Sequence, residues 1–142
     1  MKTLLTFLLP ILFISTILFN DTNAQVTVSG ATAGNGNYTT LAASFNAINA
    51  GAQTGPNIFI TITANTAEPA TGAVLNNGTW TSLTIQPNAT GRTISANVTG
   101  GLALVDLNGA DRVTIDGMAF TNFTFSNTSI SATADKKHTY TG

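Results

Sequence analysis

The chain has 142 residues, a formal net charge of −1, no Cys, one His and only 8% charged residues, against about 25% in an average globular protein. This composition excludes a disulfide framework, a Cys-ligated metal site, a multi-histidine metal site within the chain and a basic field for a nucleic-acid backbone. Abundant Thr, Asn, Gly and Ala, together with Ile, Leu, Val and Phe, are typical of a β-rich protein with a neutral exposed face.

The N-terminus has the three parts of a secretory signal. Lys2 supplies the positive charge, residues 4–19 form the apolar centre, and small residues follow, with Ala24 at the expected cleavage position. The apolar run of about 16 residues is shorter than the roughly 20 that a membrane-spanning helix needs. We therefore expect residues 1–24 to be removed, leaving a chain that starts at Gln25, is secreted or lies on the outer cell surface, and has no stable membrane span.

Residues 25–57 are expected to form a strand followed by a short helix. Residues 25–29 alternate polar and apolar side chains, which is typical of a strand, and a glycine-rich turn follows at 30–37. The helix is predicted by apolar residues at helical spacing, with Thr39 or Thr40 as its N-cap and Gly51 at its end. Those apolar residues are Leu41, Ala42, Phe45 and Ile48.

From Pro56 onward the apolar residues recur with period two, which predicts many short strands separated by turns. The motif Leu83-Thr84-Ile85 returns as Val113-Thr114-Ile115, and Ile60-Thr61-Ile62 precedes both. Three strands per roughly 23–30 residues favour a right-handed parallel β-helix of about three turns over residues 58–134, with the helix as its N-terminal cap. A β-sandwich is the alternative. If only one end of this stack is capped, the other end exposes a strand edge. Such an edge predicts aggregation or end-to-end pairing.

Residues 38–49 resemble the N-terminal cap of pectin-lyase-like β-helix proteins, and residues 66–70 and 106–117 strengthen this resemblance. The chain from Gln25 to about Ser131 resembles the start of large secreted, adhesin-like surface proteins of gliding Gram-negative bacteria. The resemblance implies a β-helix fold and export through the type IX route, whereas the activity stays open because this fold carries lyases, hydrolases and adhesive stalks alike. Residues 135–142 are polar and break the alternation, so we expect a truncation point there, in a longer parent protein.

The acidic residues of the strand region are expected to be structural. Asp106 and Asp116 should point outward on either side of a corner, because Val105, Leu107 and Ile115 should point inward. This places the two carboxylates too far apart for a glycosidase pair, which needs about 5 to 9.5 Å.

Asp111 is expected to cap the turn at that corner. Asp106, Asn108 and Asp111 are candidates for a calcium site, because calcium prefers hard oxygen ligands.

Aromatic side chains suggest binding more than catalysis. Trp80 and Tyr38 are candidates for stacking on sugar rings. A hydrolase triad is rejected because His138 lies in the polar tail, so we expect no catalytic residue and no cofactor.

The predicted function is a non-catalytic segment of an exported, adhesin-like surface protein that presents Thr- and Asn-rich faces to polysaccharide or surface proteins. The alternatives are the N-terminal part of a polysaccharide lyase or glycoside hydrolase with catalytic turns beyond residue 142, and a structural stalk without a ligand.

Overall fold

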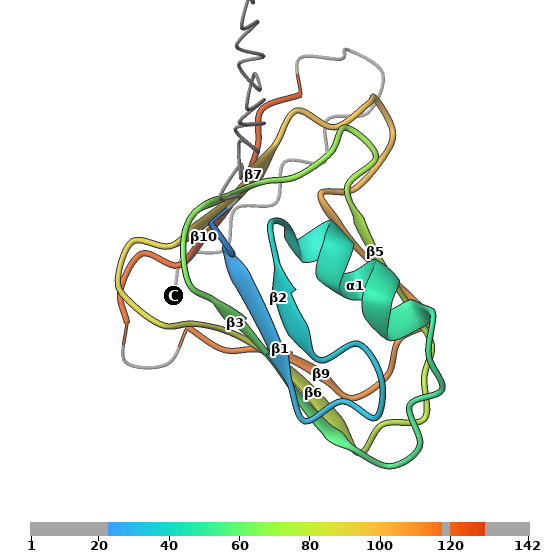
Figure 1. The fold of residues 1–142 in the computed structure, drawn as a ribbon. Helices are drawn as coiled ribbons and strands as arrows, with labels where there is room; N and C mark the ends of the chain where they lie inside the picture. Colours follow the sequence, from blue (N-terminus) through green and yellow to red (C-terminus); the bar gives the residue numbers. More distant parts are fainter. Residues whose placement is uncertain (1–22, 118–119, 130–142) are drawn as a thin grey trace, which may run out of the picture.

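The computed structural model describes residues 23–117 and 120–129 (Figure 1). Most of the predicted signal sequence and the polar tail at 135–142 lie outside these residues. The described chain is all-β with one short helix, as predicted. Its elements are, in chain order, β1 (Val26–Ser29), β2 (Gly36–Tyr38), α1 (Leu41–Asn49), β3 (Asn57–Ile62), β4 (Thr66–Ala67), β5 (Ala73–Asn76), β6 (Ser82–Pro87), β7 (Thr93–Ala96), β8 (Val105–Asn108), β9 (Val113–Ile115) and β10 (Thr124–Asn127).

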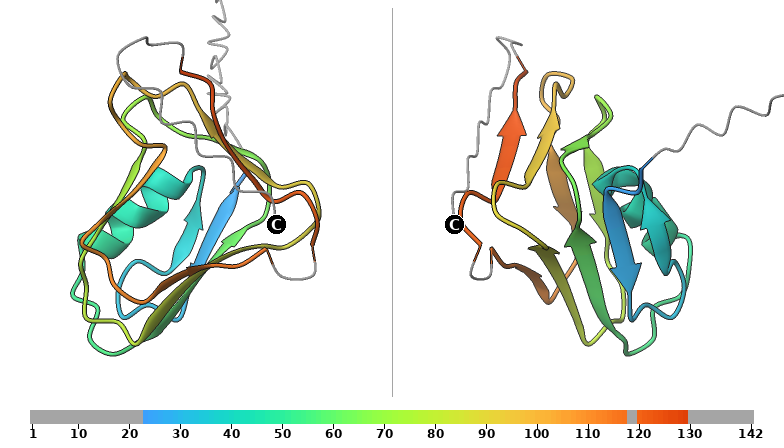
Figure 2. Two further views of the ribbon diagram at one scale, coloured as in Figure 1. Left: turned by 180° about the vertical axis from the view of Figure 1, so that it is seen from behind. Right: turned by 60° about the vertical axis from the view of Figure 1, so that its left-hand side comes forward.

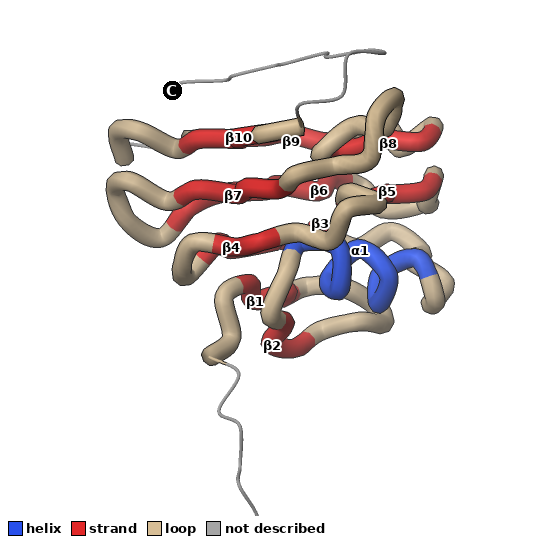
Figure 3. The backbone as a smooth tube through the Cα atoms, turned by 90° about the horizontal axis from the view of Figure 1, so that it is seen from above, coloured by secondary structure: helices blue, strands red, loops and turns tan. Residues whose placement is uncertain are grey.

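Strands from β3 onward lie in three successive layers, which Figure 3 shows one above another and the right-hand view of Figure 2 shows side by side. The first layer holds β3 and β4, the second β5, β6 and β7, and the third β8, β9 and β10 (Figure 3). Equivalent strands of neighbouring layers pair in parallel, giving the strand orders β3-β6-β9, β4-β7-β10 and β5-β8. Asn57 pairs with Ser82 of the next layer, and Asn76 pairs in the same way with Asn108.

The register between the first two layers differs from the sequence prediction by two residues. Ile58 and Ile60 pair with Leu83 and Ile85, whereas the shared motif predicts Ile60 and Ile62 for these positions. Because three isoleucines alternate along β3, a shift of two residues keeps the same face inward and leaves the pattern unchanged. The predicted equivalence of Leu83 and Val113 is confirmed, since these two residues pair directly.

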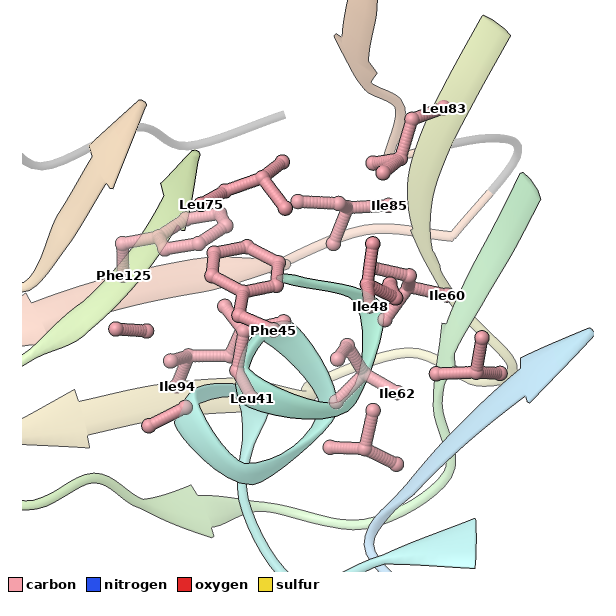
Figure 4. Close-up of a cluster of buried hydrophobic side chains, with 14 of the residues drawn as sticks. Leu41, Phe45, Ile48, Ile60, Ile62, Leu75, Leu83, Ile85, Ile94 and Phe125 are labelled. Carbon is pink, nitrogen blue, oxygen red and sulfur yellow. The ribbon is translucent and has the colours of Figure 1, made fainter. Parts of the chain in front are cut away.

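The core lies inside the layers, where the inward side chains of the strands form one cluster with the apolar face of α1 (Figure 4). Leu41, Phe45 and Ile48 of the helix lie toward the strand residues that the same view labels. Burying side chains of this size contributes roughly 1.5–3 kcal/mol each. The largest side chains that are almost fully buried are Trp80, Phe45, Leu41, Ile48, Ile58, Ile60, Ile62, Leu75, Leu83, Ile85, Ile94 and Val26.

The N-terminal end of the stack is closed by β1, β2 and α1. Strand β1 pairs antiparallel with both β2 and β3, which covers the outer edge of β3. Asn49, at the end of α1, covers the edge of β5 with its side-chain amide. Its Nδ2 donates to the carbonyl of Val74 at 2.9 Å, and its Oδ1 accepts from the backbone N–H of Asn76 at 3.0 Å. The amide thus replaces the peptide group of a neighbouring strand.

The opposite end of the stack is open in the described part of the chain. Figure 3 shows β8, β9 and β10 together in the outermost layer, far from α1 and β1. Leu107 and Ile115 share the inward face with their partners Leu75 and Ile85, as predicted. They are nevertheless 38% and 43% exposed, whereas their partners are fully buried. The reason is that each is in the last described strand of its sheet.

Candidate functional site

The outward face of the five-stranded sheet β2-β1-β3-β6-β9 is polar and uncharged within its strands, and we call it the outer face. Side chains alternate between the two faces of a strand, so each apolar core residue is followed by an outward neighbour. Asp116 and Arg112, directly outside β9, are the nearest charges in sequence. The polar side chains of the outer face are those of Thr27, Ser29, Asn37, Asn57, Thr61, Ser82, Thr84, Gln86 and Thr114.

Hydrogen bonds between strands hold part of this polar surface in place. The hydroxyl of Thr27 donates to Asn37 Oδ1 at 2.9 Å, and the hydroxyl of Ser82 donates to Asn57 Oδ1 at 2.9 Å. Both acceptors belong to the amides of exposed residues, whose N–H groups can reach solvent. Such pre-ordered donors lose little conformational freedom when they bind another polar molecule.

Phe59 lies in the middle of the outer face and is 43% exposed. It pairs with Ser29 of β1 on one side and with Thr84 of β6 on the other. A large ring on an otherwise polar surface offers an apolar face bordered by hydrogen-bonding groups. Sequence reasoning missed Phe59, although its position between Ile58 and Ile60 already predicts an outward side chain.

Trp80, predicted as a sugar-stacking residue, is buried instead. Its side chain is only 1% exposed, and its Nε1 donates to the carbonyl of Asp111 at 2.7 Å. The ring packs over Gly78, where an added Cβ would lie 2.2 Å from a ring carbon. The prediction for Trp80 was therefore wrong, because a glycine two residues earlier and a carbonyl in the next layer hold the indole inside.

Tyr38, the other predicted stacking residue, lies on β2 at the edge of the same sheet. It is half-buried, and its hydroxyl donates to the carbonyl of Gly34 at 2.8 Å. The ring therefore packs over the turn that precedes β2. Its role in sugar binding stays a prediction.

The candidate calcium ligands lie on β8 and in the turn after it. Asp106, Asn108 and Asp111 are all exposed, and the Nδ2 of Asn108 donates to the Oδ1 of Asn76 in the layer before at 3.0 Å. Across residues 23–117 and 120–129, no group of three or more His, Cys, Asp or Glu side chains is placed to hold a metal ion. The calcium site stays a prediction.

Glu68 is the acid whose role the sequence did not indicate. It is 7% exposed, and its two carboxylate oxygens accept hydrogen bonds from the backbone N–H groups of Leu41 and Ala42 at 2.8 and 2.7 Å. The hydroxyl of Thr40, the N-cap, accepts the N–H of Ala43 at 3.0 Å. The first three N–H groups of α1, which a helix cannot satisfy itself, therefore all have side-chain acceptors, and Glu68 is structural.

A small hollow lies between the end of α1 and the turn that joins β5 to β6. Its volume is about 240 Å³, and Asn49, Gln53, Asn76 and Trp80 are among the residues that line it. This is below the range of roughly 300 to 1,000 Å³ of most ligand pockets, and Asn49 and Asn76 already bond to each other there. The outer face is therefore the stronger candidate for binding.

Comparisons with known proteins do not indicate a family or a function for the chain. No family model matches the chain, and no curated protein or solved structure matches it either. No helix within the described ranges is long and apolar enough to cross a membrane.

Proposed function

We propose that the chain is the N-terminal, capped part of a right-handed parallel β-helix of an exported, adhesin-like surface protein. Parallel pairing of equivalent strands in successive layers supports this fold over a β-sandwich, because a sandwich is built from antiparallel sheets. The apolar N-terminal segment and the resemblance of residues 38–49 to a β-helix cap support export and the protein class.

The proposed activity is non-catalytic binding of polysaccharide on the outer face. The observation that carries it is the exposed ring of Phe59, framed by the hydroxyls of Ser29 and Thr84. A sugar ring presents C–H groups on its faces and hydroxyls at its edge, so an aromatic ring bordered by hydroxyls and amides complements it. The neutral surface suits a long polymer bound by many weak contacts, which gain strength from repetition.

The positions of the acids support binding without cleavage. Glu68 uses both carboxylate oxygens for the helix N-terminus, while Asp106 lies on β8 and Asp116 follows β9, which belongs to another sheet. Neither arrangement provides the paired carboxylates of glycoside hydrolysis.

The test is binding of the purified protein to arrays of neutral and uronic-acid glycans, comparing wild type with Phe59→Ala. Loss of ring contact should weaken the best signal about fivefold or more. Val74→Ala is the matched control, because Val74 is a similarly exposed apolar residue on another sheet, and it should bind like wild type. No binding to any glycan, or equal binding by Phe59→Ala, would contradict the proposal.

A further inference from the structure

Three asparagines of the chain are each followed directly by glycine. They are Asn35, Asn77 and Asn108, and all three are exposed. Glycine has no Cβ to shield its backbone nitrogen or to restrict the turn, so this nitrogen can reach the side-chain amide carbon of the preceding asparagine. Because the following residue and the exposure are alike at the three sites, the hydrogen bonds of each amide should decide how readily it reacts.

The amide of Asn35 is held by both of its polar groups. Its Oδ1 accepts from the backbone N–H of Ala31 at 2.9 Å, and its Nδ2 donates to the carbonyl of Ala31 at 2.7 Å. The following Gly36 lies in β2, where it pairs with Val28. Both hydrogen bonds must break before the Asn35 side chain can turn toward the nitrogen of Gly36, which should slow the reaction about tenfold or more.

The amide of Asn108 is held by one of its polar groups. Its Nδ2 donates to Asn76 Oδ1 at 3.0 Å, and the following Gly109 forms an isolated bridge with Asn76. Asn108 is the last residue of β8, so its backbone is part of a strand. We therefore expect a reactivity between those of a doubly held amide and an amide without hydrogen bonds.

Asn77 differs from both, because it comes directly after β5 and lies in no strand. Its side-chain amide makes no hydrogen bond to any residue in the ranges 23–117 and 120–129. The N–H of Gly78 likewise has no acceptor within the described part of the chain. No hydrogen bond among these residues therefore has to break before the two groups react.

We propose that Asn77 is a self-modification site, at which asparagine converts to aspartate and isoaspartate without an enzyme. The backbone nitrogen of Gly78 forms a bond to Cγ of Asn77, the bond from Cγ to Nδ2 breaks, and Nδ2 leaves as ammonia with the proton of the backbone nitrogen. Water then opens the resulting succinimide ring. Breaking the new bond gives aspartate, and breaking the original peptide bond gives isoaspartate, whose backbone is one carbon longer.

The longer backbone has a consequence because Trp80 packs over Gly78. A Cβ added at Gly78 would lie 2.2 Å from a carbon of the Trp80 ring, so the turn cannot shift toward the ring. The hydrogen bond from Trp80 Nε1 to the carbonyl of Asp111 holds the ring in place. Isoaspartate at position 77 should therefore move Gly78 away from the ring and lower the stability, whereas aspartate there only adds a charge to an exposed side chain.

The test compares the three sites in one sample of the purified full chain, incubated at mildly alkaline pH and sampled over time. Chymotrypsin cleaves after Tyr38 and Trp80, so the three asparagines fall in separate peptides. Deamidation raises the peptide mass by about one dalton, and an isoaspartyl methyltransferase labels the isoaspartate product. Asn77 should react about tenfold faster than Asn35 or more, with Asn108 between them.

The same incubation in urea is the control for the role of the fold. Unfolding removes the hydrogen bonds of Asn35 and Asn108, and glycine follows all three asparagines, so the three rates should then lie within about twofold of one another. Slower reaction at Asn77 than at either other site in the folded protein would overturn the proposal. An unchanged ratio of rates in urea would overturn it as well, because the order would then not depend on the fold.

Asn77→Gln tests the effect on the turn, because a side chain one carbon longer closes the ring far more slowly. After incubation, this variant should unfold at its original urea concentration, whereas the wild-type midpoint should fall as isoaspartate accumulates at residue 77. Freshly purified Asn77→Asp should unfold like fresh wild type, which separates the added charge from the longer backbone. An unchanged wild-type midpoint despite isoaspartate at residue 77 would contradict the predicted effect.

Discussion

Glu68→Ala should destabilise the fold more than any other single removal of a charge from the described residues. The substitution takes away the acceptors of two helix N–H groups, those of Leu41 and Ala42, which are 0% and 7% exposed. Water cannot readily replace a carboxylate at such a buried position. The negative charge also lies at the N-terminus of α1, where the helix dipole favours it.

The expected loss follows from these contacts. Each hydrogen bond to a charged group contributes about 1.5–3 kcal/mol, so losing both should lower the free energy of unfolding by about 3 to 6 kcal/mol. This is a large share of the roughly 5–15 kcal/mol of an ordinary domain. Glu68→Gln keeps the size and one carbonyl acceptor, so it should cost about half as much.

Equilibrium unfolding in urea measures this loss. Trp80, the single Trp of the chain, is buried and reports on the core by its fluorescence. Asp106→Asn is the control, because Asp106 is exposed and its substitution should stay within about 0.5 kcal/mol of wild type. If Glu68→Ala cost less than about 1 kcal/mol, the carboxylate would not hold the helix start, and the explanation of the closed end would be refuted.

Two further predictions concern the polar groups at the closed end and in the core. Asn49→Ala removes both hydrogen bonds to the edge of β5 and should lower the stability by about 1 to 2 kcal/mol, measured by the same unfolding curves; the exposed neighbour Asn46→Ala should have almost no effect. Thr66→Val should raise the stability by about 1 kcal/mol, because the Thr66 hydroxyl is buried without a hydrogen-bond partner among the described residues. A destabilised Thr66→Val protein would show that this hydroxyl has a partner after all.

The strand region was predictable because its signal is local. Period-two alternation in Ile58 to Ile62 marks an inward face, and Thr40 before Leu41 marks a helix start. The pairing of layers was predictable only to within two residues, since an alternating run of isoleucines fits two registers equally well. The open-end positions of Leu107 and Ile115 depend on the absence of a further paired strand among the described residues, which no local pattern contains.

The site residues also differ in whether the sequence could predict their positions. Phe59 could have been found from its place between two inward isoleucines. Trp80 could not, because its burial depends on the carbonyl of Asp111, 31 residues away. Glu68 likewise bonds to groups 26 and 27 residues earlier in the chain. Side chains that bind distant backbone groups leave no spacing pattern in a single sequence.

Binding without cleavage is tested most directly by following protein and polymer in one sample. The protein is incubated with pectin, alginate or a neutral glucan, with and without calcium. Affinity electrophoresis then measures retention of the protein, and light scattering measures the molar mass of the polymer. We predict retention by at least one polymer, weaker retention of Phe59→Ala, and an unchanged polymer mass. A falling polymer mass would show an enzyme, and no retention by any polymer would show that the outer face does not bind polysaccharide.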